Sequence, residues 1–201
     1  MELNKKICTK CGEEKDFSKF NKEKIKKLGL ASICKSCDNK RTKAYRRTKE
    51  GLITQIYKNQ INTSKKRGDV YPTYTKQELK DWMFSQEIFH ELYDDWKDSG
   101  YVKDLVPSCD RLDDYKGYNL KRLQLMTWGE NEQKNYNDIK NGINNKNSIA
   151  VISVNKETEE EIEYYSMNQA ERETRVSHKH ISKCCLGERK SAGGFFWRCK
   201  D

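Results

Sequence analysis

The chain has 201 residues and carries 40 lysine and arginine against 31 aspartate and glutamate side chains, a net charge of +9. Apolar residues make up 34% of it, against about 45–50% in a typical soluble domain. No long apolar run occurs, and residues 1–10 lack the apolar segment of a secretory signal, so we expect neither a membrane span nor secretion. This composition excludes one large core and predicts several small units.

The charge is divided unevenly along the chain. Residues 1–68 hold 20 basic and 7 acidic side chains, whereas residues 69–114 hold 5 and 12. The basic front indicates a polyanion partner, and the acidic block indicates a separate task. A solvated lysine-rich surface is the alternative, but the aromatic residues and cysteines among the basic ones favour nucleic acid.

Half of the eight cysteines form two closely spaced pairs. Cys8 and Cys11 are separated by two residues, as are Cys34 and Cys37, and 22 residues lie between the pairs. Two such turns complete a tetrahedral four-thiolate site for a structural Zn²⁺ ion, which would fold a segment that cannot fold alone. Redox chemistry is the weaker alternative, because no βαβ pattern surrounds either pair.

The remaining cysteines, Cys109, Cys184, Cys185 and Cys199, have no such spacing. We expect them to be buried free thiols. A second metal site, formed by the last three with His178 or His180, is the less favoured alternative.

The segment after Cys37 is basic and has no apolar periodicity, so it is either a linker or a helix lying on phosphates. From Leu52 the apolar spacing becomes helical and continues to Gly68, a stop signal. We assign DNA-backbone contacts to the basic residues at both ends of this region, namely Lys40, Arg41, Arg46, Arg47, Lys65, Lys66 and Arg67.

Two further helices are expected before residue 100. Thr75 and Glu78 form a capping box that opens the first, and residues 88–96 carry helical apolar spacing that ends before Gly100. The aromatic residues here are predicted to be core, and His90 among them structural.

Residues 105–142 read as strand, loop, strand and helix. Two short apolar runs flank a turn-rich centre at residues 113–119, which predicts a β-hairpin with an extended loop. Thr127 and Glu130 form a second capping box, and the helix it opens closes at Gly142.

In the C-terminal segment, from residue 149 on, the sequence predicts strands at residues 149–154 and 161–165. A helix opened by a capping box of Ser166 and Gln169 is expected to follow. A break at Val176 starts another helix, so the pair is a helix-turn-helix candidate, and residues 193–197 form a wing or a closing strand. A protein-binding α+β domain is the alternative. The expected DNA contacts are His178, Lys179, Lys183, Arg189 and Lys190.

The hairpin delivers Asp110 and the following helix delivers Asn131. If the hairpin packs on the helix, a carboxylate and an amide oxygen converge, and such hard ligands suit Mg²⁺. A metal there would bridge the scissile phosphate and the leaving oxygen and stabilise the charge that develops.

The stretch from Pro107 through Gly117 to Lys134 resembles the ββα-metal motif of HNH endonucleases, and the chain as a whole is similar to free-standing phage homing endonucleases of that superfamily. Members commonly carry a C-x₂-C zinc module in front. Residues 166–199 are similar to the NUMOD-type modular DNA-binding domain found behind such nucleases. The resemblance implies metal-dependent hydrolysis of phosphodiester bonds at a specific DNA target.

The chain departs from the family pattern at two positions. Asp110 matches the ligand position, but Arg111 stands where the general-base histidine is usual, and Arg122 occupies the place of the middle asparagine. Asn119, three residues earlier, can serve the loop-bracing role instead, and Asn131 matches the final ligand.

Arg111 stays protonated at neutral pH, so we expect it to clamp a phosphate oxygen rather than to act as a base. The base would be Asp113, Asp114, a metal-bound water or His90. Asp113 and Asp114 rank first because they lie beside the site in sequence, although a turn-capping role suits both equally well.

We therefore expect an α+β protein of small modular units. The predicted boundaries are 1–48 for the zinc module with its basic tail, 49–101 for a helical region, 102–147 for the HNH core and 148–201 for the NUMOD-like domain. The predicted function is a DNA endonuclease that uses Mg²⁺ or another divalent cation. The alternatives are a non-catalytic DNA-binding regulator built from the same parts and a zinc-ribbon RNA binder. We expect a monomer with double-stranded DNA as partner, no small-molecule substrate, and a cytoplasmic location, in the host cell if the protein is phage-encoded.

Overall fold

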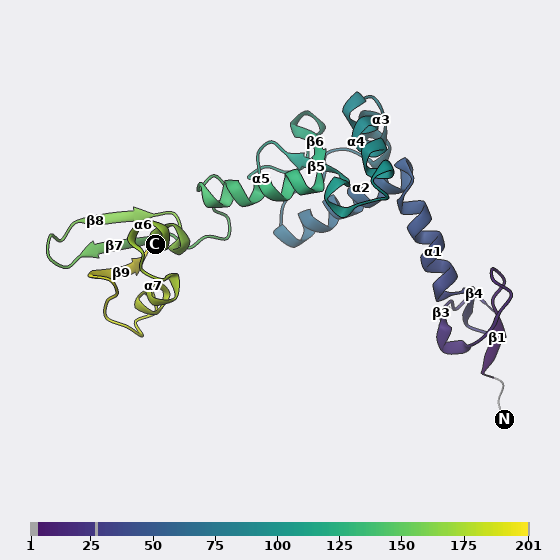
Figure 1. The fold of residues 1–201 in the computed structure, drawn as a ribbon, viewed down its shortest axis with the longest axis horizontal. Coiled ribbons are helices and arrows are strands. Elements are labelled where there is room, and N and C mark those ends of the chain that lie inside the picture. The colour runs from purple at the N-terminus through teal and green to yellow at the C-terminus, as the bar shows by residue number, and fades with distance from the viewer. Residues whose placement is uncertain (1–3, 27, 201) are drawn as a thin grey trace. The chain divides into compact units, whose positions relative to one another are not determined.

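The computed structural model describes residues 4–26 and 28–200. The fold is α+β, as predicted, with helices and small antiparallel sheets (Figure 1). The chain divides into two compact units, residues 1–128 and residues 129–201. Each unit is described by itself.

The first unit begins with a four-cysteine module, residues 4–37. Its strands β1 (Lys5–Ile7) and β2 (Glu14–Asp16) pair antiparallel, as do β3 (Phe20–Lys22) and β4 (Leu30–Cys34), and a 3-10 turn, η1 (Phe17–Lys19), links the two hairpins. The buried apolar cluster of this module consists of Cys8, Phe20 and Cys34, with Leu30, Ile33 and Cys37 packed against it. Phe20 is therefore a core residue, but so small a core cannot fold a segment of this length without help.

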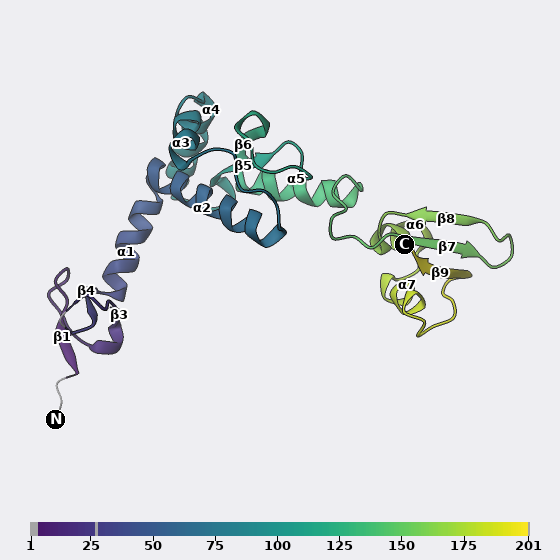
Figure 2. The same ribbon diagram turned by 180° about the vertical axis from the view of Figure 1, so that it is seen from behind.

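Helix α1 (Lys35–Arg46) follows β4 without a break, which decides between the linker and the helix predicted for this basic segment. It buries none of its residues. Figures 1 and 2 show it running from β4 to α2 with no other helix or strand packed along its middle.

The core of the first unit is built on three helices. Helix α2 (Lys49–Arg67) starts at Thr48, whose hydroxyl accepts a hydrogen bond from the Gly51 amide at 3.0 Å, and ends at Gly68, whose φ of 68° is left-handed. Helix α3 (Lys76–Phe84) opens with the predicted capping box of Thr75 and Glu78, both halves of which are present. Helix α4 (Glu87–Asp98) follows at once.

A β-hairpin lies against these helices. Strands β5 (Pro107–Arg111) and β6 (Leu123–Thr127) pair antiparallel in the register Pro107↔Thr127 to Arg111↔Leu123, with the 3-10 turns η2 (Lys103–Leu105) before β5 and η3 (Leu120–Arg122) before β6. The buried core comprises Leu52, Ile53, Tyr74, Leu79, Met83, Phe89, Trp96 and Leu123. The aromatic residues of α4 are thus core residues, as predicted.

Helix α5 (Trp128–Lys140) begins directly after β6, and the boundary between the two units lies just after its first residue. The amide of Trp128 donates to the carbonyl oxygen of Val106 at 2.7 Å, so the start of the helix is tied to the residue before β5. The predicted stop at Gly142 has a φ of 76°.

The second unit contains a three-stranded antiparallel sheet in the order β8-β7-β9, formed by β7 (Val151–Asn155), β8 (Glu161–Tyr164) and β9 (Phe195–Cys199). The closing strand predicted near residues 193–197 is therefore β9. Helices α6 (Met167–Thr174) and α7 (His178–Cys185) pack on the sheet. The core residues are Val151, Tyr164, Ala170, Val176, Ile181, Cys184, Ala192 and Trp197.

The capping box predicted for α6 is half correct. The Ser166 hydroxyl accepts from the Gln169 amide at 3.0 Å, as expected. The Gln169 side chain instead accepts from the amide of Tyr165, one residue before the cap. The residue that follows α6, Arg175, has a left-handed φ of 61°, and this turn leads into α7.

The junction of α1 and α2 depends on a glycine. A Cβ atom at Gly51 would lie 1.8 Å from the carbonyl oxygen of Tyr45, a backbone atom that cannot yield without moving α1. We expect Gly51→Ala to lower the free energy of unfolding of the first unit by about 1–3 kcal/mol, the usual cost of overpacking. Urea unfolding followed by circular dichroism measures this. At Gly117 an added Cβ would meet its nearest neighbour at an ordinary 3.4 Å, so Gly117→Ala is the control and should change stability by less than about 0.5 kcal/mol; equal effects of the two would contradict the steric account.

Candidate functional site

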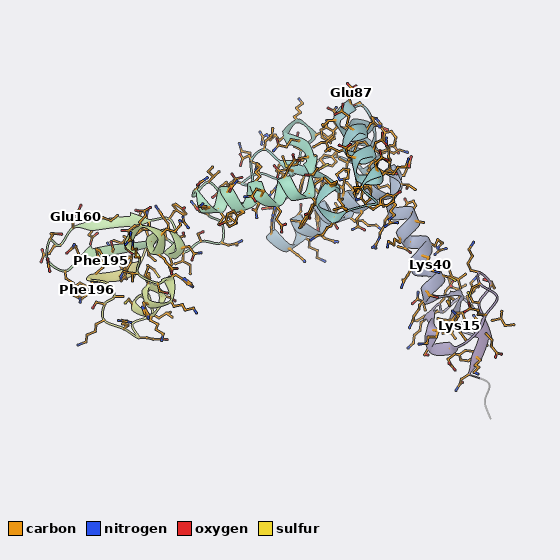
Figure 3. The ribbon with its side chains drawn as sticks, viewed as in Figure 1. Lys15, Lys40, Glu87, Glu160, Phe195 and Phe196 are labelled. Atoms are coloured by element: carbon orange, nitrogen blue, oxygen red, sulfur yellow. The ribbon has the colours of Figure 1, made fainter. Side chains whose placement is uncertain are left out.

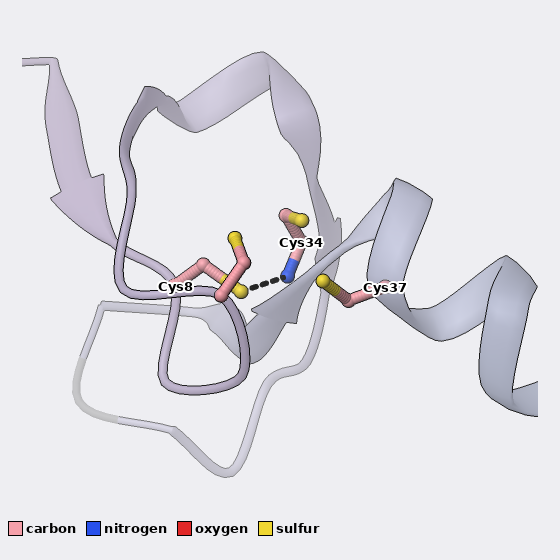
Figure 4. A group of neighbouring side chains, drawn as sticks. Cys8, Cys34 and Cys37 are labelled. Carbon is pink, nitrogen blue, oxygen red and sulfur yellow. Dashed lines mark hydrogen bonds between the residues drawn. The ribbon is translucent and has the colours of Figure 1, made fainter.

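The four cysteines of the module converge on one point. Their Sγ atoms all lie within 4.8 Å of one another, and a tetrahedral zinc ion with sulfur ligands at about 2.3 Å separates its ligands by roughly 3.8 Å. Figure 4 shows the thiols of Cys8, Cys34 and Cys37 turned toward one another. These four cysteines could therefore hold a structural metal such as zinc.

Local backbone structure positions each pair of cysteines. Cys8 and Cys11 flank a turn after β1 that closes where Gly12, with a φ of 72°, donates its amide to the carbonyl oxygen of Cys8 at 2.9 Å. Cys34 ends β4 and caps α1, and Cys37 lies in the first turn of that helix. The strand end and the helix start thus present the second pair to the first.

Hydrogen bonds give the cysteine thiols of the cluster different pKa values. The Ser36 hydroxyl, with help from the backbone at Cys37, lowers the pKa of Cys34 to about 6. The pKa of Cys37 is raised to about 12, chiefly because this thiol is hydrogen-bonded to Cys34. Burial alone would raise the pKa of Cys8, but amide donors, including that of Cys34 at 3.2 Å, outweigh it and lower the pKa. A cluster that already favours thiolate sulfur suits a divalent ion, which displaces the remaining protons on binding.

Among the described residues, no other group of cysteine, histidine and acidic side chains is arranged to hold a metal ion. Cys184 is buried in the core of the second unit, as predicted, and burial raises the pKa of Cys109 to about 12. Cys199 is exposed, so the expectation of a buried thiol is wrong at that position, which lies near the end of an edge strand.

Most of the basic residues assigned to DNA in the first unit are exposed on helices. Lys40, Arg41 and Arg46 are exposed on α1, and Lys65, Lys66 and Arg67 are exposed in the last turn of α2. Arg47 is half-buried, because its guanidinium lies over the ring of Tyr101, 4.0 Å from the centroid.

In the second unit the predicted DNA contacts His178, Lys179, Lys183, Arg189 and Lys190 are all exposed, on α7 or just after it. Two of them have local partners. His178 is hydrogen-bonded to the Glu171 carboxylate, and the Nε atom of Arg189 donates to the carbonyl oxygen of Ser191 at 2.8 Å.

Asp110 lies on β5 and is only 7% exposed. Its register partner on β6 is Gln124, whose side-chain amide donates to the Asp110 Oδ2 atom at 2.8 Å. Sequence reasoning missed Gln124, although pairing the two strands outward from the loop would have placed it opposite Asp110.

Arg111 is even more deeply buried, at 4% exposed. Its guanidinium donates to the Lys116 carbonyl oxygen at 2.8 Å and to the Asp114 Oδ1 atom at 3.0 Å, and the Asp69 carboxylate lies 3.8 Å away. These contacts brace the loop between β5 and β6. Consecutive residues of a strand point to opposite faces, so Arg111 and Asp110 are directed to different sides of the hairpin.

The two other polar loop residues of the predicted site also make local contacts. The Asp113 carboxylate accepts from the amide of Tyr115 at 2.9 Å, and this bond, with the ammonium of Lys116, lowers the pKa of Asp113. Asp113 thus fills the turn-capping role, and a lowered pKa makes it a weaker base. Asn119 caps η3 by accepting from the amide of Lys121 at 3.0 Å and donates to the Thr73 hydroxyl at 3.3 Å, so it ties the loop to the segment before α3.

His90 lies in α4 among the core aromatics. Its Nε2 atom is 3.0 Å from the carbonyl oxygen of Phe84 and its Nδ1 atom is 2.8 Å from the Lys49 ammonium. Partners on both ring nitrogens match the structural role expected for it by default.

Asn131 lies in the first turn of α5. This helix begins at Trp128, whose amide donates to the carbonyl oxygen of Val106.

Comparisons with protein-family models, curated proteins and solved structures found no match to this chain. None of the helices among the described residues has the length and apolar character needed to cross a bilayer.

The cysteine cluster predicts a metal-dependent fold. We expect Cys34→Ser to reduce the bound zinc from about one ion per chain to less than 0.1, because three thiolates bind zinc far more weakly than four. Elemental analysis of the dialysed protein measures the metal. Amide signals of the four-cysteine module should collapse in NMR spectra while those of the second unit remain. Cys199→Ser, at an exposed cysteine outside the cluster, is the control, and a loss of zinc in that variant would contradict the assignment.

The role of Arg111 can be separated from that of its neighbours. We expect Arg111→Met to lower the free energy of unfolding by about 3 kcal/mol, because two carboxylates and a carbonyl oxygen lose their partner. Arg122→Met removes the same charge from an exposed position of the same loop, so it should cost less than about 0.5 kcal/mol. Urea unfolding measures both, and similar values would show that Arg111 does not brace the loop.

Proposed function

We propose that this chain is a DNA endonuclease of the HNH type that hydrolyses phosphodiester bonds with a divalent cation such as Mg²⁺. The observation that carries the proposal is the succession of β5, β6 and α5, an antiparallel hairpin followed at once by a helix, with Asp110 at an inner position of β5. This is the order of elements in the ββα-metal motif that the sequence resembles.

The resemblance to the ββα-metal motif assigns the metal ligands to Asp110 on β5 and to Asn131 on α5. A carboxylate and an amide oxygen are hard donors, which fits Mg²⁺, Mn²⁺ or Ca²⁺ rather than a thiophilic ion. The Gln124 amide restricts the Asp110 carboxylate to one orientation without removing its charge. When bound, the cation would supply Lewis-acid stabilisation of the charge that builds up on the phosphate.

Other residues of the hairpin position the site in this proposal. Arg111 fixes the loop from the opposite face, and Asn119 ties the loop to Thr73, so both are positioning residues. Direct contact of Arg111 with phosphate remains a prediction. Asp114 is paired with Arg111 and Asp113 caps its turn, so neither carboxylate is favoured as the general base, and a bound cation would instead supply the activation of the attacking water.

The basic segments would supply affinity for duplex DNA. Residues 69–114 carry 12 acidic and 5 basic side chains, so the surroundings of β5 repel phosphate. The exposed lysine and arginine residues of α1, α2 and α7 lie outside this block and can neutralise phosphates. Zinc is the ion proposed for the four cysteines, in a structural role.

A non-catalytic DNA-binding regulator is the second candidate. The observation in its favour is that an arginine with local partners stands where a general-base histidine would be expected, and that His90 is engaged on both ring nitrogens elsewhere. Such a protein would retain the zinc and the affinity for DNA but would not cut.

Plasmid nicking in the presence of Mg²⁺ or Mn²⁺ distinguishes these functions. We expect the native chain to cut and Asp110→Asn, which keeps an oxygen acceptor for Gln124, to lose at least about 100-fold of the rate. Asn131→Ala should lose cleavage with less than a threefold change in DNA affinity. Asp98→Asn, an exposed carboxylate at the end of α4, should cut like the native chain. If the native chain does not cut with any divalent ion, the regulator is favoured.

A further inference from the structure

Most of helix α1 is exposed, and only Cys37, Asp38 and Thr42 are half-buried. Its twelve residues include five basic side chains and one acidic one, and none is buried. An isolated helix of this length is only marginally stable in water, and a helix that is polar all round commonly bridges other parts. Here the cysteine cluster holds its start and the tight contact at Gly51 holds its end. A basic helix that is fixed at both ends and largely exposed between them can bind an anionic partner.

Two grooves run along this helix. The first, here the module-side groove, has a volume of about 550 Å³ and is lined by Lys10, Ile33, Cys37, Lys40 and Arg41. The second, here the core-side groove, has a volume of about 560 Å³, and its basic lining residues are Lys43, Arg46 and Arg47. No acidic side chain lines either groove. Both grooves therefore suit an anionic ligand.

The grooves lie on roughly opposite faces of α1. Cys37 and Arg41 are spaced by one helical turn on the module-side face, whereas Lys43 and Arg46 share the core-side face. At about 100° per residue, Arg41 lies roughly 140–160° around the helix from both of these residues, whereas Lys40 lies only about 60° from Lys43. Arg41 on one side and Lys43 with Arg46 on the other therefore present positive charge in opposed directions. Figure 3 labels Lys40 among the side chains that extend from α1.

We propose that α1 lies in the major groove of B-form duplex DNA and that its two basic grooves receive the two sugar-phosphate backbones that border it. The proposal rests on the proposed function for its partner, duplex DNA. An α-helix with its side chains is about 10–12 Å across, and the B-form major groove is about 12 Å wide. One helix can thus contact phosphates on both strands.

The same geometry argues against other nucleic acids. The major groove of A-form RNA is too deep and narrow for side chains to read, so a helix with two opposed basic faces cannot contact both backbones there. A single strand offers one backbone and would occupy one groove at a time. The ring of Tyr101 under Arg47 and the Asp38 carboxylate 2.7 Å from Arg41 hold two of the guanidinium groups near their grooves.

Paired substitutions on the full chain test the proposal. One variant carries Lys40→Gln with Arg41→Gln, a second carries Lys43→Gln with Arg46→Gln, and a third combines all four. Lys76→Gln with Lys97→Gln is the control, because it removes two exposed charges from α3 and α4. Zinc content and circular dichroism establish that each variant folds.

Fluorescence anisotropy with a short duplex at several salt concentrations measures the contacts. Each pair should lower affinity on the order of tenfold and reduce the salt slope by about 1.8, two phosphate contacts at about 0.9 each. The combined variant should show both losses, and the control should show neither. A loss confined to one pair, or equal binding of duplex RNA, would overturn the two-backbone arrangement.

Dimethyl sulfate probing identifies the groove. Guanine N7 lies in the major groove and adenine N3 in the minor groove. Saturating native protein should protect N7 on a short duplex and leave N3 reactive, and the combined variant should not protect N7. Protection of adenine N3 alone would place the helix in the minor groove and would contradict the proposal.

The two proposals fail in different ways. If Asp110-dependent cleavage occurs but the α1 variants bind DNA like the native chain, the placement of α1 is wrong and the nuclease stands. If the α1 variants lose affinity and N7 protection while no divalent ion supports cleavage, the placement stands and the nuclease is wrong. No affinity of the native chain for duplex DNA would overturn both.

Discussion

The convergence of four thiol groups on one point is the constraint on which the front of the molecule depends. Cys8, Phe20 and Cys34 are the buried apolar residues of the module, and burying a large apolar side chain is worth only about 1.5–3 kcal/mol. Ordering the backbone of some thirty residues costs far more than that. A metal ion at the cysteines can supply the difference, and because Cys34 and Cys37 also form the start of α1, the same ion would fix one end of that helix.

Features with a local cause were predictable from the sequence. The spacing of the cysteines, the capping box at Thr75 and the stop at Gly68 each depend on contacts between residues a few positions apart, and all are present in the structure. Helix α1 was left open between two interpretations because it has no apolar face, and periodicity can reveal a helix only when one side is buried. The exposed position of Cys199 likewise depends on strand pairing across nearly fifty residues.

In the β5–β6 hairpin, closeness in the sequence is a poor guide to which side chains lie together. Sequence reasoning placed Asp110 and Arg111 in one site because of the resemblance to the ββα-metal motif, and added Asp113 because it lies beside them in sequence. A strand sends consecutive side chains to opposite faces, so Asp110 and Arg111 of β5 point to different sides of the hairpin. The burial of Arg111 and its ion pair with Asp114 follow from the path of the loop, which the sequence does not specify. Gln124 shows the opposite effect. It lies fourteen positions from Asp110 in the sequence, but the strand register makes it the direct partner of Asp110.

The uneven distribution of charge along the chain is consistent with a division of roles between its segments. A metal site for phosphodiester chemistry needs carboxylates, and carboxylates repel the substrate before the cation binds. Concentrating the acidic residues in positions 69–114 and the basic ones in positions 1–68 would separate these opposing demands along the chain. In the proposed function, elements such as α1 would neutralise phosphates without a core of their own, because the cysteine cluster and the α2 junction hold them. Affinity carried this way is set by counterion release, so salt would weaken the binding of DNA without acting on the oxygen ligands of the hairpin.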